Sequence, residues 1–293
     1  MKIHSVAWGW TPTPEDMPQG DSLLMIADQV KALGFDGVDY LSTFESLDTY
    51  FTKAECARVR KHCESLGLAV GGFVFQSAMW NSPKKADTSK QLKYFEKCAK
   101  AADALGAKII SCIVPGPYGA AGTRRDRSPS EKVTSNLPKG YDWDADWSRF
   151  TGALAQACDI AAKYGITVAL ECFPRSLCAT PHAMLKAIED VGRGNFGIQM
   201  DTAHLMNQNI DVETTVYMLG GHIKHVHLKD TDGLTRGNLP CGSGLVDYSR
   251  LFQVLKDIGY QGRASVEVEF TDNPQRYMRD ALHHARMCLD GSF

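Results

Sequence analysis

Residues 164–171 read YGITVALE, a glycine followed by a short run of apolar, β-favouring residues that ends on a carboxylate. Glycine directly after a helix tolerates the left-handed conformation that caps the last helical carbonyls. The same step, from a helical pattern through glycine into an apolar residue, occurs at Gly34, Gly67, Gly106, Gly165 and Gly259. We therefore expect a turn from helix to strand at each of these glycines.

Apolar runs and amphipathic stretches alternate along the whole chain. The runs cover residues 3–8, 37–41, 68–75, 108–114, 166–172, 196–200, 223–228 and 264–269. The amphipathic stretches cover residues 22–33, 53–66, 89–105, 147–164, 181–191, 212–219, 248–258 and 274–289. Strands that alternate with helices pair in parallel, and eight repeats favour a closed (β/α)8 barrel, the TIM barrel. An open doubly wound sheet would normally carry a glycine-rich phosphate loop after its first strand, and WGWTP at residues 8–12 is not one.

Length and composition agree with one domain. The chain has 293 residues, and barrels of this class run to about 250 residues or more as a single domain. Apolar residues make up 44% and charged residues 23%, the balance of a soluble globular protein with a large core. We expect a single α/β domain over residues 1–293.

Charge and cysteine usage exclude several classes of protein. The net charge is −2 and no run of lysine or arginine is longer than a pair, so we expect no nucleic-acid partner. The nine cysteines include no C-x-x-C pair, which argues against a disulfide framework and a zinc knuckle. The first residues lack the layout of a secretory signal, and no apolar run reaches membrane-spanning length. We expect a cytoplasmic protein with no membrane partner.

One connection is unusually long. Residues 115–141 are rich in Gly, Pro, Ser, Arg and Asp, and they follow the fourth expected strand. We expect a loop at about 115–142 on the catalytic face, which acts as a lid or as a subunit contact. Its arginines, Arg124, Arg125 and Arg127, either reach an anionic substrate group or are solvated loop charges.

Ionisable residues end four consecutive expected strands. Reactive side chains of such barrels lie where strands end, because the opposite face and the interior serve stability. The fifth, sixth and seventh strands end near Glu171, Asp201 and His227, and the eighth carries Glu267 and Glu269. Carboxylates gathered at the mouth of an apolar barrel repel one another unless a cation compensates their charge. Surface charge would explain any one of these residues, but four on consecutive strands favour a divalent metal.

Strand alternation narrows the choice of ligands. His225 and His227 face the same side of their strand, and His227 lies nearer the strand's end. We expect His227 to be the ligand and His225 to be a hydrogen-bonded core histidine one layer deeper. The same parity leaves both Glu267 and Glu269 able to point inward. Three carboxylates and one imidazole suit Mn2+, Mg2+ or Co2+ better than a soft ion, and Zn2+ stays an alternative.

Several segments of the chain resemble the xylose-isomerase-like barrel superfamily, specifically its sugar phosphate isomerase/epimerase branch, which includes the ketose 3-epimerases. The segments are VALE at 168–171, MDTAH at 200–204, HVHLKD at 225–230, LPCGSG at 239–244 and GYQGRASVE at 259–267. The likeness runs from about residue 3 to about residue 269 and is strongest after residue 166. These motifs are specific to the superfamily and not to one substrate.

The resemblance implies a set of ligands and bases. In ketose 3-epimerases, metal-bound glutamates of the fifth and eighth strands move a proton on opposite faces of the substrate, which implies Glu171 and Glu267 for these roles. Asp201 and His227 would complete the coordination of one divalent metal, with Mn2+ as the leading candidate. His204 resembles the family's substrate-contacting histidine. The family also implies a homo-oligomer, a dimer or a tetramer, and a hetero-oligomer is an alternative.

Further residues are candidates for contact with a sugar or sugar derivative. Lys229 would either donate to a substrate oxygen or form a salt bridge with Asp230 or another carboxylate. Trp8, Trp10 and Phe44, near the first two strand ends, would stack on a sugar ring or simply pack in the wall. The arginine that the epimerases place shortly after the seventh-strand histidine has no clear equivalent here, since Arg236 comes later. The identity of the sugar is therefore open.

Three other functions compete with the expected isomerase or epimerase. A lyase, such as a dehydratase or a deglycosidase of an oxidised sugar, would share the first step and then expel a substituent. A DNA-repair nuclease like endonuclease IV would need further histidines at the second, third and fourth strand ends, but FQ at 75–76 and VP at 114–115 occupy the last two of these positions. It would also need a basic surface, and the net charge of −2 gives no sign of one. A non-catalytic sugar-binding barrel would have no use for the paired glutamates.

Overall fold

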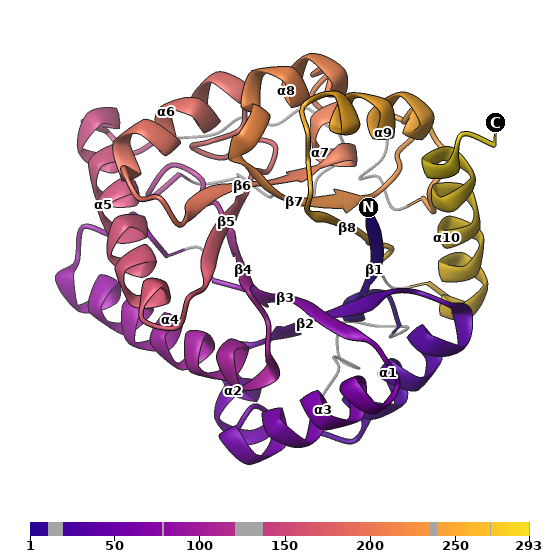
Figure 1. The fold of residues 1–293 in the computed structure, drawn as a ribbon. Coiled ribbons are helices and arrows are strands. Elements are labelled where there is room, and N and C mark those ends of the chain that lie inside the picture. Colours follow the sequence, from indigo (N-terminus) through magenta and orange to yellow (C-terminus); the bar gives the residue numbers. More distant parts are fainter. Residues whose placement is uncertain (11–19, 78, 121–136, 235–238, 270, 293) are drawn as a thin grey trace.

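A closed barrel of eight parallel strands forms the centre of the computed structural model (Figure 1), which describes residues 1–10, 20–77, 79–120, 137–234, 239–269 and 271–292. The strands are β1 (Lys2–Val6), β2 (Gly37–Ser42), β3 (Ala69–Phe75), β4 (Ile109–Ile113), β5 (Thr167–Glu171), β6 (Phe196–Asp201), β7 (Ile223–Leu228) and β8 (Arg263–Val266). Each strand pairs with its sequence neighbours, and β1 pairs with β8 to close the ring. The expected (β/α)8 barrel is confirmed.

Helices form a ring outside the strands (Figure 1). They are α1 (Ser22–Leu33), α2 (Phe44–Tyr50), α3 (Lys53–Ser65), α4 (Lys85–Leu105), α5 (Trp143–Ala162), α6 (Pro181–Val191), α7 (Thr202–Met206), α8 (Val212–Leu219), α9 (Tyr248–Asp257) and α10 (Pro274–Asp290). Short 3-10 turns, η1 (Ala7–Trp10) and η3 (Gly220–His222), flank β1 and β7. No helix among the described residues is long and apolar enough to cross a membrane.

Glycines end the helices where the sequence predicted them. Gly34 and Gly106 cap α1 and α4 in the left-handed conformation, at φ 94° and 86°. Gly67, Gly165 and Gly259 also have positive φ. The prediction of helix-to-strand turns at all five glycines is confirmed, because only glycine adopts this conformation without steric cost.

The strand register sets the depth of the ionisable residues. Glu171 is paired with Gln199 across β5 and β6, and Asp201 is paired with His227 across β6 and β7. The outer faces of the strands pack on the helices through an apolar core that includes Val168, Ile198 and Val226. The strands thus present their polar residues to the barrel interior and their apolar residues to the helices.

The two ends of the long connection between β4 and α5 are tied to α5. The buried carboxylate of Asp146 accepts hydrogen bonds from the backbone N–H of Tyr118 (2.8 Å) and the hydroxyl of Tyr141 (2.7 Å). A Cβ placed on Gly119 would lie 3.4 Å from Pro138, so the two ends of the connection lie side by side. Arg124, Arg125 and Arg127 lie outside the described residues.

Candidate metal centre and active site

Four ionisable side chains from consecutive strands meet at the C-terminal end of the barrel. Glu171, Asp201, His227 and Glu267 each offer one ligand atom, and these atoms all lie within 4.8 Å of one another. All four side chains are buried. Glu171 and Asp201 end β5 and β6, His227 lies in β7, and Glu267 directly follows β8. The structure therefore brings together the four residues that the sequence predicted as metal ligands.

Asp201 uses its two carboxylate oxygens differently. Oδ1 accepts the backbone N–H of His204 (2.8 Å) and so caps the N-terminus of α7. Oδ2 is buried and has no hydrogen-bond partner among the described residues. Burial raises the pKa of Asp201 to about 8, with Glu267 and Glu171 adding to the rise and Lys229 opposing it. A carboxylate in this position needs a nearby cation to stay ionised.

His227 lies between the two glutamates. Its Nδ1 is 2.6 Å from Glu267 Oε2 and 3.2 Å from Glu171 Oε1. Burial acts to lower the pKa of His227, but these two carboxylates outweigh burial and raise that pKa well above its ordinary value. The Nδ1 atom thus lies between two carboxylates, beside the place that a cation would take. The unpartnered Oδ2 of Asp201 and the mixed oxygen and nitrogen donors fit a hard or borderline divalent ion.

Lys229 is a buried cation beside this cluster, with 1% of its surface exposed. Its Nζ donates to Glu267 Oε1 (3.3 Å) and makes a shorter contact with Glu269 Oε1. Burial opposes ionisation of Glu267, yet Lys229 and His227 hold the pKa of Glu267 well below its ordinary value. The partner of Lys229 is therefore a pair of glutamates rather than Asp230.

Asp230 is instead a structural residue. Its carboxylate accepts backbone N–H groups of Thr231 (2.9 Å), Gly242 (2.9 Å), Gly244 (3.0 Å) and Val246 (3.1 Å). These bonds fold the connection between β7 and α9 back onto the strand. One buried carboxylate thus fixes the backbone of the segment LPCGSG at Gly242 and Gly244.

Of the other residues predicted to contact the substrate, His204 lies beside the cluster, whereas Trp10 packs in the barrel wall. His204 lies in α7 beside the cluster, and its ring packs on Phe173 with centroids 4.2 Å apart. Trp10 is buried and donates from Nε1 to Ser5 Oγ (2.8 Å), so it packs in the wall, and Trp8 is half-buried against the core. Both lie in η1, since β1 ends at Val6 and not at Trp8 as expected. The Phe44 side chain and Arg236 lie outside the described residues.

Sequence analysis missed several polar partners of the ligands. Strand alternation left both Glu267 and Glu269 able to point inward. In the structure β8 ends at Val266, and both glutamates contact the ammonium of Lys229. Gln199 Nε2 lies 3.2 Å from His227 Nδ1. Its position in the sequence gave a signal, because Gln199 precedes Asp201 by two residues and so faces the same interior.

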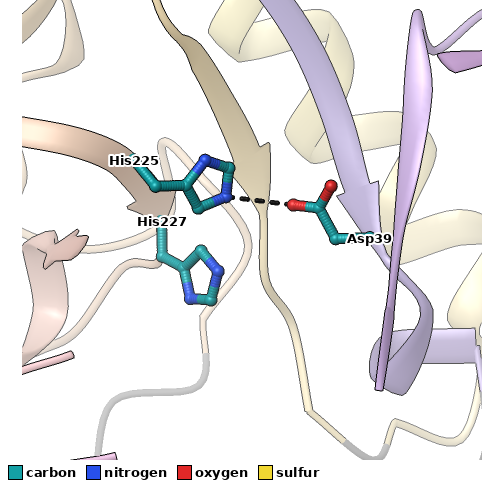
Figure 2. A group of neighbouring side chains, drawn as sticks. All are labelled: Asp39, His225 and His227. Carbon is teal, nitrogen blue, oxygen red and sulfur yellow. Dashed lines mark hydrogen bonds and ion pairs between the residues drawn. The ribbon is translucent and has the colours of Figure 1, made fainter. Parts of the chain in front are cut away.

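One layer below the cluster, His225 makes the hydrogen bond expected of a core histidine. Its Nε2 lies 3.0 Å from Asp39 Oδ2, a carboxylate of β2 on the other side of the barrel interior. Figure 2 shows both rings of β7, His225 bonded to Asp39 and His227 beside it. Asp39, His225 and His227 also offer ligand atoms within 4.8 Å of one another.

Comparisons with known proteins agree with the fold and the motifs. The L-ribulose 3-epimerase of Mesorhizobium japonicum is 34% identical over 274 residues, which cover 90% of this chain and 80% of that protein. A solved L-ribulose 3-epimerase superposes with a TM-score of 0.78 at 19% identity, covering 99% of this chain and 95% of that one. A D-psicose 3-epimerase from Clostridium cellulolyticum, solved with D-tagatose, gives a TM-score of 0.77 at 18% identity and covers 99% of both chains.

The family model described as xylose isomerase-like TIM barrel matches residues 27–288, which is most of the chain. At under 25% identity the solved structures show the fold alone, whereas the family model and the L-ribulose 3-epimerase relative show common descent. The chain belongs to the xylose isomerase-like TIM barrel family.

Proposed function

We propose that the protein is a divalent-metal-dependent sugar epimerase or isomerase that removes a proton next to the carbonyl of a ketose. The observation that carries the proposal is the convergence of Glu171, Asp201, His227 and Glu267 within 4.8 Å. The similarity to an L-ribulose 3-epimerase over 90% of the chain supports a sugar as substrate. Neither the four converging side chains nor this similarity identifies which sugar is the substrate.

Two carboxylates carry the proton transfer in this proposal. A C–H group next to a carbonyl is too weakly acidic for a free carboxylate, and a bound divalent ion supplies the positive charge that makes it acidic enough. Glu171 approaches from the end of β5 and Glu267 from the residue after β8. One carboxylate, ionised at the start, accepts the proton from carbon, and the other, which carries a proton of its own, delivers that proton to the opposite face and so inverts the configuration at carbon.

A neighbouring cation, Lys229, favours the ionised form that Glu267 needs to accept a proton. Lys229 Nζ, 3.3 Å from Glu267 Oε1, favours the ionised form of that glutamate. Lys229 and His204 are also the donors best placed to hold a sugar oxygen, since both lie beside the cluster. Oxygen-rich donors with one imidazole favour Mn2+, with Mg2+, Co2+ and Zn2+ as alternatives. The proposal also includes contacts of the sugar with Trp8, Phe44 and Arg236. It further includes a cytoplasmic location and assembly as a dimer or tetramer.

The test is solvent isotope exchange. Metal-loaded protein incubated with L-ribulose, D-psicose and 3-oxo-glycosides in deuterated water should place deuterium in the recovered ketose, as measured by mass spectrometry. Glu267→Gln should abolish the exchange, because the amide cannot accept the proton. Glu189→Gln, the same change at an exposed residue of α6, should leave exchange intact.

The same incubation separates the proposal from a lyase. Deuterium in a product that keeps all its substituents supports epimerisation or isomerisation. Release of water or an aglycone would assign the protein to the lyases instead, since a lyase shares only the first proton removal. Undiminished exchange by Glu267→Gln would show that Glu267 is not a base.

A further inference from the structure

A polar layer fills the barrel interior beneath the four proposed ligands. Asp39 Oδ2 accepts from Ser265 Oγ (2.5 Å) and lies 3.0 Å from His225 Nε2. Asp39 Oδ1 accepts the backbone N–H of Gly72 (2.7 Å) and lies 3.5 Å from His4 Nδ1. These side chains come from β1, β2, β7 and β8 and are 0–2% exposed. The interior of such barrels is normally filled by branched apolar residues, so this layer is a departure that needs a reason.

The chain makes room for this layer with glycines. A Cβ on Gly37 or Gly71 would overlap the ring of His4, and a Cβ on Gly71 would also overlap Asp39 Oδ1. Burial disfavours the charged form of a carboxylate unless partners replace the lost water. The imidazoles of His225 and His4 hold the pKa of Asp39 well below its ordinary value although burial acts to raise it, so the carboxylate stays charged. Dedicated partners therefore keep a charged carboxylate inside the barrel, at positions where apolar packing would be usual.

The polar layer contacts the four proposed ligands through the ring of His225. The imidazoles of His225 and His227 meet edge to face, with centroids 5.2 Å apart and planes at 79°. The Nδ1 atom of His227 also lies 3.2 Å from Gln199 Nε2, and the Gln199 amide oxygen accepts a short hydrogen bond from Ser111 Oγ. The ring of His227 therefore contacts His225, which belongs to the polar layer, and Gln199, which is itself bonded to Ser111 of β4.

We propose that Asp39 and His225 are positioning residues, which fix the ring of His227 in the orientation in which it binds the metal. Asp39 fixes His225 by a hydrogen bond, and His225 fixes His227 by contact between the rings. Loss of a hydrogen-bonded outer partner of a metal-binding histidine weakens metal affinity by about 10- to 100-fold, and we take that range as the scale for the ring contact of His225. This inference rests on the proposed metal-dependent function, because it concerns the same site.

A second metal at Asp39, His225 and His227 is the competing explanation, since their ligand atoms also lie within 4.8 Å. The contacts of Asp39 argue against it. Its Oδ2 already meets Ser265 and His225 and its Oδ1 accepts a backbone N–H, so a cation would compete with these donors for the same carboxylate. Sharing His227 between two metals would in addition require its imidazole to lose both protons.

The experiment measures metal binding directly, without an enzyme assay. Mn2+ affinity and stoichiometry would be determined by electron paramagnetic resonance for the wild type, Asp39→Asn and Ser265→Ala. We expect one Mn2+ per chain, a dissociation constant at least about tenfold higher in Asp39→Asn, and a smaller rise in Ser265→Ala. The d–d absorption of bound Co2+ should also change in Asp39→Asn, because the orientation of His227 changes.

Tyr40→Phe is the matched control. Tyr40 is the next residue of β2, is fully buried, and faces the helices, where its hydroxyl donates to the backbone oxygen of Leu23 (2.9 Å). Its loss should lower the thermal midpoint of the metal-free protein without changing Mn2+ affinity. If Asp39→Asn and Ser265→Ala bind Mn2+ as tightly as the wild type, the positioning role is wrong. Two Mn2+ per chain, reduced to one by Asp39→Asn, would assign a second metal site instead, and a wild type that binds no Mn2+ would overturn the proposed function itself.

Discussion

Single side chains in the cluster serve the fold and the site at once. Asp201 illustrates this, because Oδ1 caps α7 while Oδ2 is left for the site. Lys229 is the second example: its ammonium is buried, and the two glutamates that it contacts are its counter-charges. Removing one partner of a buried ion pair leaves an uncompensated charge and costs about 3–5 kcal/mol. The residues of this site should therefore be coupled in stability as well as in chemistry.

Lys229→Met tests that coupling. In the presence of a chelator, we expect the free energy of unfolding to fall by about 3–5 kcal/mol, because Glu267 and Glu269 lose their common cation. The double variant Lys229→Met/Glu269→Gln should lose less than the sum of the single variants, since one unpaired carboxylate is gone. Urea denaturation followed by circular dichroism gives these values. Strictly additive losses would mean that Lys229 and Glu269 do not interact in solution.

At the scale of elements, long periodic segments were predictable and short ones were not. The bounds of α1, α6 and α8 agree with the predicted stretches to the residue, because caps and glycines punctuate them. Helices α2 and α7 were missed, since five to seven residues are too few to display a helical period. Their signal was the cap: Thr43 bonds with Ser46 at the start of α2, and Asp201 bonds with His204 at the start of α7.

The four proposed ligands were predictable from local signals in the sequence, whereas the residues that contact them were not. Strand ends and family motifs mark Glu171, Asp201, His227 and Glu267 without any knowledge of contacts. The pairing of Asp39 with His225 joins residues 186 positions apart, and the contact of Lys229 with Glu269 spans 40 positions. Neither pairing follows from local propensity or spacing, because the first depends on β2 facing β7 across the barrel and the second on the pairing of β7 with β8.

The connection between β7 and α9 gives a prediction at this scale. Asp230→Asn keeps one carboxamide oxygen for four backbone N–H donors, so about two of them lose an acceptor. We expect the free energy of unfolding to fall by about 2–4 kcal/mol and proteolysis at residues 239–246 to increase. Asp247→Asn is the control in the same connection, because asparagine caps α9 about as well as aspartate does. Equal behaviour of the two variants would contradict the role given to Asp230.

For the whole molecule, the proposed metal joins one half of a closed barrel. Its four ligands come from β5, β6, β7 and the residue after β8, while β1 to β4 supply none of them. Without a cation, three carboxyl groups share one buried space, and burial disfavours the charged form of Asp201, as its raised pKa shows. The half of the barrel around β5 to β8 should therefore be the less stable half in the metal-free protein.

Hydrogen exchange with and without Mn2+ tests this asymmetry. At a Mn2+ concentration about 100 times its dissociation constant, binding should stabilise the folded state by about 2.7 kcal/mol and raise the thermal midpoint. If the ligand half opens locally, amides at the ends of β5 to β8 should be protected most, and those of β3 (Ala69–Phe75) and β4 (Ile109–Ile113) should change little. Equal protection of all eight strands would mean that the barrel opens only as a unit. In that case the repulsion among Glu171, Asp201 and Glu267 is shared by the entire closed sheet, and the metal stabilises the molecule as a whole rather than one half of it.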